Sequence, residues 1–112
     1  MAGIAGLITK FTQKEVDQLF KKSHRIFHSG AATILAAPRD KDYARVLIIT
    51  SRKTGPATQR NVIRRRLKSI FYQEKLFSTL KFDLVFIAKR PVIALTFIQL
   101  KELVLIAVKA IM

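Results

Sequence analysis

The 112-residue chain is long enough for one modest hydrophobic core, and half of its residues are hydrophobic, which argues against intrinsic disorder. It has 21 Lys and Arg against 7 Asp and Glu, a formal net charge of +14 at pH 7. Such an imbalance opposes compaction through self-repulsion, and its usual reason is a polyanionic partner, most often nucleic acid and less often an anionic membrane. The absence of cysteine excludes disulfides and thiolate metal sites.

No segment has the features of a targeting or membrane-spanning sequence. Residues 2–8 are apolar but short, and no charged region precedes them. Uncharged stretches such as residues 91–100 are far below the roughly 20 residues that a spanning helix needs. We therefore expect a soluble, cytoplasmic protein with a single domain over residues 1–112, in which residues 1–8 are disordered.

The first expected element is a helix over residues 13–22. Thr12 and Glu15 have the spacing of a capping box, and apolar residues follow at helical intervals at Val16, Leu19 and Phe20. A Ser-Gly pair then interrupts the chain before residues 33–37, a short apolar run.

The middle of the chain alternates turn signals with apolar or basic runs. Residues 38–42 are polar and indicate a hairpin loop, and the β-branched run at residues 45–50 is typical of a buried strand. Gly55 and Pro56 then mark a break, and Pro56 suits the first turn of a helix that we expect over residues 57–72.

The last part of the chain predicts a strand and a helix. Residues 82–88 are an apolar strand ended by Arg90-Pro91, and Thr96 with Gln99 gives a second capping box before a helix over residues 97–110. The order helix, two strands, helix, strand, helix predicts an α+β fold. We expect a hairpin and then a strand–helix–strand unit in a compact two-layer sandwich, a small mixed sheet with helices on one or both faces.

The expected helix over residues 57–72 has two distinct faces. At about 100° per residue, one sector collects the apolar residues Ile63, Leu67, Ile70 and Phe71. The opposite face collects polar residues: Asn61, Arg64, Arg65 and Lys68. Arg60 and Arg66 flank the apolar stripe, where long stems can pack while the guanidinium groups reach outward.

The charge around this helix differs from that of an ordinary solvated surface, which mixes signs. No acid occurs between Asp42 and Glu74, whereas eight basic residues do. Arg52 and Lys53 precede the helix, whose N-terminus offers free N–H groups to an anion. The sequence therefore predicts a nucleic-acid-binding surface, although a merely solvated charge run is the alternative.

Catalytic and metal-binding patterns are not evident. The seven acids are scattered without a carboxylate pair or metal-ligand spacing, and no Gly-rich phosphate loop occurs. His24 and His28 are four residues apart, but helix is doubtful there, so RNA contacts or plain surface positions are the better interpretation. We therefore predict no catalytic residue and no metal ligand in this chain.

Two aromatic residues bracket a basic run between the first helix and the first apolar run. Phe20 and Phe27 flank Lys21, Lys22, His24 and Arg25. Aromatic rings interleaved with basic residues suit single-stranded nucleic acid, whose bases stack on them. Core packing is the alternative for both rings, since Phe20 also continues the apolar stripe of its helix.

The basic region closely resembles the signature of the bacterial ribonuclease P protein component. Residues 51–57 read Ser-Arg-Lys-Thr-Gly-Pro-Ala, and residues 60–65 read Arg-Asn-Val-Ile-Arg-Arg. In that family a Ser-Lys-Lys-x-Gly-x-Ala run leads into an Arg-Asn-x-x-Lys/Arg-Arg helix. The resemblance covers residues 9–110. The chain departs from the family pattern at Ser23, Leu35, Pro56 and Val62.

The resemblance implies a protein subunit that assists an RNA enzyme. In this family the RNA subunit removes the 5′ leader of precursor tRNA with Mg²⁺ held mainly in the RNA. The protein is a compact α+β sandwich like domain 2 of ribosomal protein S5, with a left-handed strand–helix–strand crossover in place of the usual right-handed form. A cleft between the first helix and the sheet holds the leader.

Carried over to this chain, the resemblance assigns contacts with the catalytic RNA to Arg60, Asn61, Arg64 and Arg65. Arg52 and Lys53 fit the same basic surface, and we add Lys68 to these RNA-binding residues from its place on the polar face of the helix. The resemblance assigns Phe20 to the leader cleft, to which we add Phe27. A ribosomal or other structural RNA-binding protein of similar shape is the alternative. A basic nuclease acting alone is a third hypothesis, and the scattered acids count against it.

Overall fold

The computed structural model describes residues 4–111, which form a four-stranded sheet with helices on both of its faces. In chain order the main elements are α1 (Gln13–Lys22), β1 (His24–His28), β2 (Ala32–Pro38), β3 (Val46–Ile49), α2 (Ala57–Gln73), α3 (Leu76–Thr79), β4 (Phe82–Ala88) and α4 (Phe97–Lys109). Two short 3₁₀ helices, η1 (Ile4–Gly6) and η2 (Arg90–Ala94), complete the set. The α+β fold class and the small mixed sheet are confirmed.

The sheet has the strand order β1-β2-β4-β3. β2 pairs antiparallel with both β1 and β4, whereas β3 pairs parallel with β4. β4 is therefore central, and four consecutive residues of it, 83–86, are buried, as expected for a strand covered on both faces. Because β3 and β4 are parallel neighbours, α2 belongs to the connection that crosses between them.

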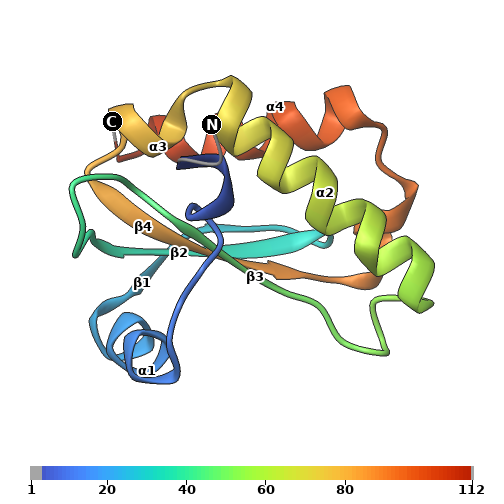
Figure 1. Ribbon diagram of the computed structural model, residues 1–112. Coiled ribbons are helices and arrows are strands. Elements are labelled where there is room, and N and C mark those ends of the chain that lie inside the picture. The colour runs from blue at the N-terminus through green and yellow to red at the C-terminus, as the bar shows by residue number, and fades with distance from the viewer. Residues whose placement is uncertain (1–3, 112) are drawn as a thin grey trace.

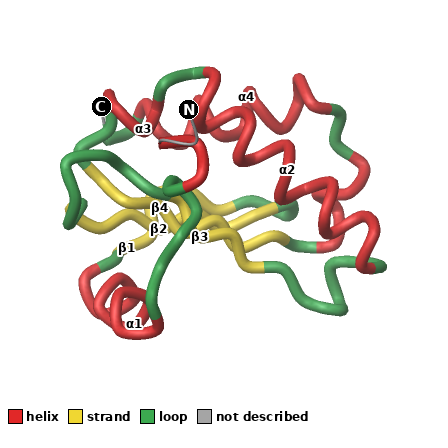
Figure 2. Tube along the Cα trace, in the orientation of Figure 1, coloured by secondary structure: helices red, strands yellow, loops and turns green. Residues whose placement is uncertain are grey.

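The helices divide unequally between the two faces of the sheet. Figure 1 shows α2, α3 and α4 together above the sheet and α1 alone below it, and Figure 2 shows the same division in red and yellow. The larger core cluster lies under the three helices and includes Ile34, Phe86, Ile63 and Leu100. A smaller cluster around Leu19, Ala37 and Val85 joins α1 to the other face.

Local signals correctly predict the three long helices. Both capping boxes form: Thr12 accepts from the N–H of Glu15 at 3.2 Å, and Thr96 accepts from the N–H of Gln99 at 3.1 Å. The apolar stripe of α2 is buried as predicted, with each of its four side chains no more than 4% exposed. No helix within residues 4–111 has the length and apolar character needed to cross a membrane.

One strand was not predicted, and two expectations, about a hairpin and about the N-terminus, are wrong. Residues 24–28, for which the sequence predicted no element, form β1, which pairs with β2. The loop over residues 38–42 does not join a hairpin, because β4 lies between β2 and β3. Disorder was expected over residues 1–8, but residues 4–8 carry η1 and bury Ile8 completely, with the Ile8 carbonyl accepting from Val46 N–H at 2.8 Å. Residues 1–3 lie outside the described residues.

Candidate nucleic-acid interface

The polar face of α2 points away from the core. Asn61, Arg64 and Arg65 are exposed and Lys68 is half-buried, as the helical phase predicts. Arg66 instead turns inward, and its Nη1 donates to the carbonyl of Leu95 at 3.2 Å. The outward cations of α2 therefore form a surface distinct from the stripe that holds the helix on the sheet.

The start of α2 lies beside the loop that follows β4, because parallel strands end at the same edge of a sheet. The loop after β3 leads into α2, and the chain after β4 turns into η2. Between them is a pocket of about 550 Å³. Its lining residues are Arg52, Lys53, Gly55, Pro56, Gln59, Arg60, Arg90 and Ile93.

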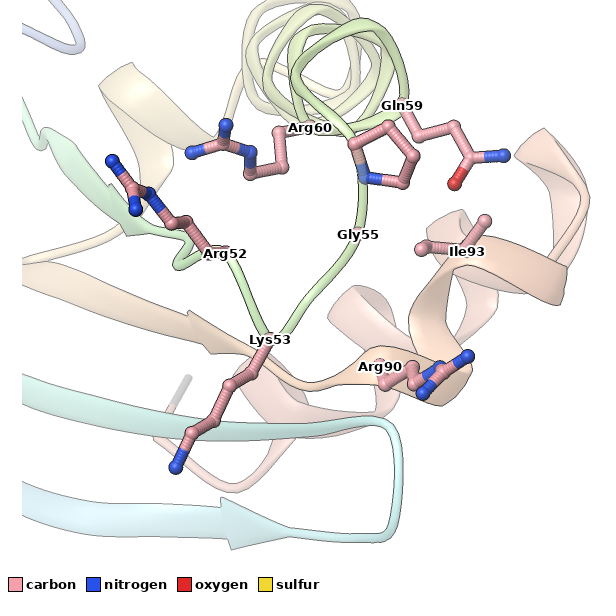
Figure 3. A pocket seen from close by; sticks show the side chains of 8 residues that line it. Arg52, Lys53, Gly55, Gln59, Arg60, Arg90 and Ile93 are labelled. Atoms are coloured by element: carbon pink, nitrogen blue, oxygen red, sulfur yellow. The ribbon is translucent and has the colours of Figure 1, made fainter.

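Four cations and no carboxylate line this pocket. In Figure 3, Arg52 and Arg60 lie on one side of Gly55, and Arg90 and Ile93 lie on the other. α2 begins here without a side-chain cap at Pro56 and without an acid in its first turn. The free N–H groups of the first turn and the positive end of the helix dipole therefore add to the cations, and the arrangement favours an anion such as phosphate.

The loop into the pocket is fixed by a buried threonine. Thr54 is 1% exposed, its hydroxyl donates to the carbonyl of Ala88 at 3.3 Å, and it accepts from the N–H of Ser51 at 3.1 Å. These bonds tie the loop to the end of β4. Arg52 and Lys53 consequently project from a braced turn.

Gly55 is required by both conformation and space. Its φ is +152°, which L side chains rarely adopt, and a Cβ placed there would lie 2.3 Å from Cδ1 of Ile93. The close approach of this backbone to η2 shapes the pocket.

We predict that Gly55→Ala lowers the free energy of unfolding by about 1–3 kcal/mol, because it adds backbone strain and a clash with Ile93. Urea denaturation measures this change. Gly30→Ala is the control, since a Cβ at Gly30 meets no atom within 4 Å. Equal stability of Gly55→Ala and Gly30→Ala would contradict the requirement for glycine at position 55.

A separate hollow lies on the other face of the sheet, the one that α1 covers. A pocket of about 250 Å³ lies between α1 and the ends of β2 and β4, lined on the helix by Lys14, Glu15, Gln18, Leu19 and Lys22. Phe20 is 41% exposed on the same helix and lies outside the described core clusters. It is thus an accessible ring on α1, although it is not among the residues that line the hollow.

Phe27 does not share that face with Phe20. It pairs with Ile34 and packs against the larger core under α2, α3 and α4. The register shift between Arg25 and Phe27 places this ring on the opposite side of the sheet from Arg25, which pairs with Leu35. Placing Phe27 in a cleft beside α1 is therefore wrong, because a β-bulge reverses the expected alternation.

The two histidines lie in β1 and are exposed. His28 Nδ1 is 3.0 Å from the hydroxyl of Thr33 and 3.4 Å from Nζ of Lys89, a cationic setting. Within residues 4–111, no three His, Asp or Glu side chains are grouped so that they could hold a metal ion.

A buried ion-pair network connects the N-terminal segment, α1 and the sheet. The Arg45 side chain is 3% exposed; its Nη1 lies 3.1 Å from Oε2 of Glu15, and its Nη2 lies 3.6 Å from Oδ2 of Asp83. Nη1 also donates to the carbonyl of Lys10 at 3.0 Å, and the guanidinium lies 4.2 Å from the centre of the Phe11 ring. This network fixes α1 against the end of the sheet.

The pKa values of the two carboxylates in the network are shifted in opposite directions. Burial raises the pKa of Asp83, while the backbone N–H and the charge of Arg45 act against that rise. The backbone N–H of Thr12 lowers the pKa of Glu15, with help from Arg45 and against a smaller effect of burial. The Arg45 charge thus stabilises both ionised carboxylates.

The family model for Ribonuclease P matches residues 11–111, nearly the whole chain. The chain belongs to the ribonuclease P family. The ribonuclease P protein component of Petrotoga mobilis is 33% identical over 86 residues, which cover 71% of this chain and 73% of that protein. That of Thermotoga petrophila is 31% identical over 86 residues, covering 71% and 74%.

Solved ribonuclease P proteins have the same fold. The Staphylococcus aureus RNase P protein aligns with a TM-score of 0.78 at 23% identity and covers 91% of this chain and 93% of its own. The Thermotoga maritima RNase P protein aligns with a TM-score of 0.76 at 25% identity and covers 90% and 94%. Membership in the ribonuclease P family implies involvement in an RNA-cleaving enzyme and an RNA partner in that complex.

Sequence reasoning found most of the cations that line the two pockets beside α2, but it did not predict that these cations form two separate groups. Arg52, Lys53 and Arg60 line the pocket at the start of α2, whereas Arg64, Arg65 and Lys68 line a second groove beside β3. Gln59 and Arg90 were missed as members of the first pocket. The signal for Arg90 was its place directly after a strand, at the edge where parallel strands end.

Proposed function

We propose that this protein is the protein subunit of ribonuclease P, which binds the catalytic RNA and the 5′ leader of precursor tRNA and promotes 5′-end maturation of tRNA in the cytoplasm. The observation that carries the proposal is the carboxylate-free pocket at the start of α2, in a chain of this family. Arg side chains present paired donors that suit phosphate oxygens.

In this proposal the catalytic RNA docks on the outward face of α2 and on the loop before it. Arg52, Lys53 and Arg60 contact phosphates at the start of the helix, and Asn61, Arg64, Arg65 and Lys68 extend the contact along it. Phosphate contacts of this kind set position and affinity, and they make binding strongly dependent on salt.

The leader binds on the opposite face of the sheet, between α1 and the strands. Phe20 supports this part of the proposal, since an exposed ring is available for stacking with an unpaired base. Lys14 and Lys22 line the neighbouring hollow and supply positive charge for the leader backbone. The chemistry is carried out by the RNA subunit, which holds most of the Mg²⁺.

We predict that Phe20→Ala reduces processing of long-leader precursors while leaving affinity for the RNA subunit unchanged. Loss of one base–aromatic stack corresponds to about 1–3 kcal/mol, or roughly 5- to 150-fold in leader affinity. Single-turnover cleavage of precursors with long and with one-nucleotide leaders measures the difference. An equal loss for both substrates together with a lowered melting temperature would mean that Phe20 only supports packing.

Reconstitution tests the proposed function directly. The purified protein is added to a bacterial ribonuclease P RNA at low Mg²⁺, and removal of the 5′ leader is followed with time. We expect cleavage only when RNA and protein are both present. Tight binding without any gain in cleavage would instead indicate a structural RNA-binding protein, and cleavage by the protein alone would place the chemistry in this chain.

A further inference from the structure

The outward face of α4 carries the two most exposed large hydrophobic residues of the described chain. Ile98 is 66% exposed and Ile106 is 62% exposed, and Leu105 beside them is half-buried. At about 100° per residue these three side chains share one side of the helix, opposite its buried residues. α4 lies next to α2 in the layer above the sheet (Figure 1). Isolated exposed aliphatic residues are ordinary, whereas a group of them on one face indicates an interaction surface.

Two opposite charges lie on the same face, too far apart to pair within one helix. Glu102 and Lys109 are exposed and seven residues apart, which is about 10 Å along a helix axis. Among residues 4–111, neither of them has an ion-pair partner. Lys101 instead faces α2, where its Nζ lies 3.2 Å from Oε2 of Glu74. The outward face of α4 therefore presents one acid and one base to a partner.

A second copy of the chain matches this face in both charge and apolar contact. Suppose that two α4 helices lie antiparallel about a two-fold axis, with Glu102 of each copy opposite Lys109 of the other. The axis then passes midway between residues 105 and 106. The side chains of Leu105 and Ile106 from both copies meet around it, and Ile98 lies beside the last turn of the second helix. The charged and the aliphatic residues thus select the same register.

The net charge of +14 on each copy opposes association. At 0.15 M salt, however, the Debye length is about 8 Å, whereas the chain extends over 33 × 33 × 28 Å. Cations on distant parts of two copies are therefore largely screened from one another. Groups that touch at the interface are screened much less, so the local pattern on α4 decides which partner fits this face.

We propose that two copies of this chain associate through the outward faces of their α4 helices in an antiparallel pair. Ile98, Leu105 and Ile106 form the apolar contact, and Glu102 and Lys109 form two ion pairs across the axis. The association is weak, because a helix of 13 residues offers less surface than a stable interface of roughly 1,200–2,000 Å². The inference is independent of the proposed function, since no residue assigned to RNA lies on α4.

Sedimentation velocity of the 112-residue chain, from micromolar to near-millimolar concentration at about 0.15 M salt, measures the dimer. Ile106→Gln keeps the charge and should raise the dimer Kd about tenfold or more, because each dimer loses two buried aliphatic side chains. Leu7→Gln, which alters an exposed aliphatic residue outside α4, should associate as the unaltered chain does. A monomer at every concentration overturns the proposal, as does unchanged association by Ile106→Gln. A chain that stays monomeric but binds phosphatidylglycerol vesicles through Ile106 would assign the face to a membrane instead.

Charge reversal separates the two ion pairs from the effect of net charge. Glu102→Lys raises the formal net charge by two units to +16, and Lys109→Glu lowers it by two units to +12. Net charge alone would make the first variant weaken the dimer and the second strengthen it. We expect both variants to weaken the dimer about threefold or more, and the double variant, again at +14, to associate as the unaltered chain does. A stronger dimer with Lys109→Glu, or no recovery in the double variant, overturns the antiparallel register.

Discussion

Replacing Arg45 with alanine should lower the free energy of unfolding by about 3–5 kcal/mol at pH 7, the largest stability effect that we expect from a single substitution. The reason is that Asp83, whose side chain is 4% exposed, would remain as a buried charge without its partner. The variant also loses the bonds to Glu15 and to the carbonyl of Lys10. Urea denaturation monitored by circular dichroism measures the change.

The cost of Arg45→Ala should shrink as the pH falls. Burial raises the pKa of Asp83 above its ordinary value of 3.8. Ionisation of this group therefore destabilises the fold as the pH rises from 3.8 through the raised pKa. Removing Arg45 raises this pKa further. The lowered pKa of Glu15 contributes stability that is present above pH 4.5 and is lost as the pH falls through the lowered pKa. Part of this stability also depends on Arg45, because Arg45 helps to lower that pKa. Both effects make the substitution less costly near pH 3 than at pH 7.

Two further variants isolate the cause. In the native protein, Oδ1 of Asp83 accepts the backbone N–H of residue 45 at 2.9 Å. The double variant Arg45→Met/Asp83→Asn keeps an oxygen that can accept this N–H but removes the buried charge. It should therefore be more stable than Arg45→Ala. Arg39→Ala removes an arginine that donates to the Leu80 carbonyl at 2.9 Å. Its smaller cost should not depend on pH. A cost of Arg45→Ala that is equal at pH 3 and pH 7 would disprove the buried-charge explanation.

Arg45 also shows where sequence reasoning reaches its limit. A lone arginine before a strand has no local signal that separates a surface residue from a buried one. Its burial depends on Phe11, Glu15 and Asp83, which come from three other segments of the chain. Local signals did predict α1, α2 and α4, because capping boxes and apolar stripes depend only on neighbours a few residues away.

The strands were harder to predict because their pairing is decided at long range. β1 lacks a clean alternation, since the bulge places Ile26 and Phe27 against the same core. The short loop after β2 favoured a hairpin, but β4 is the most continuously buried strand and takes the central position between β2 and β3. That order also brings Arg90 to the start of α2, which the place of Arg90 after a strand indicates only once the parallel pairing of β3 and β4 is known.

Among substitutions in the candidate interface, Arg65→Ala should most clearly weaken binding to a ribonuclease P RNA. Arg65 is exposed on the outward face of α2, so the change removes a partner contact without opening the core. The slope of log affinity against log salt should decrease by about 0.7–0.9, the value for one phosphate contact. Arg65→Glu should weaken binding further, because it adds repulsion to the lost contact.

Lys109→Ala distinguishes a local contact from a general effect of charge. Lys109 is exposed at the end of α4, and its removal lowers the formal net charge from +14 to +13, the same change as Arg65→Ala. If the long-range field alone attracted RNA, the two variants would lose affinity equally and keep the original slope. If α2 makes the contacts, only Arg65→Ala loses a full contact from the slope, since counterions are released where cation and phosphate meet. An unchanged slope for Arg65→Ala would remove this residue from the interface.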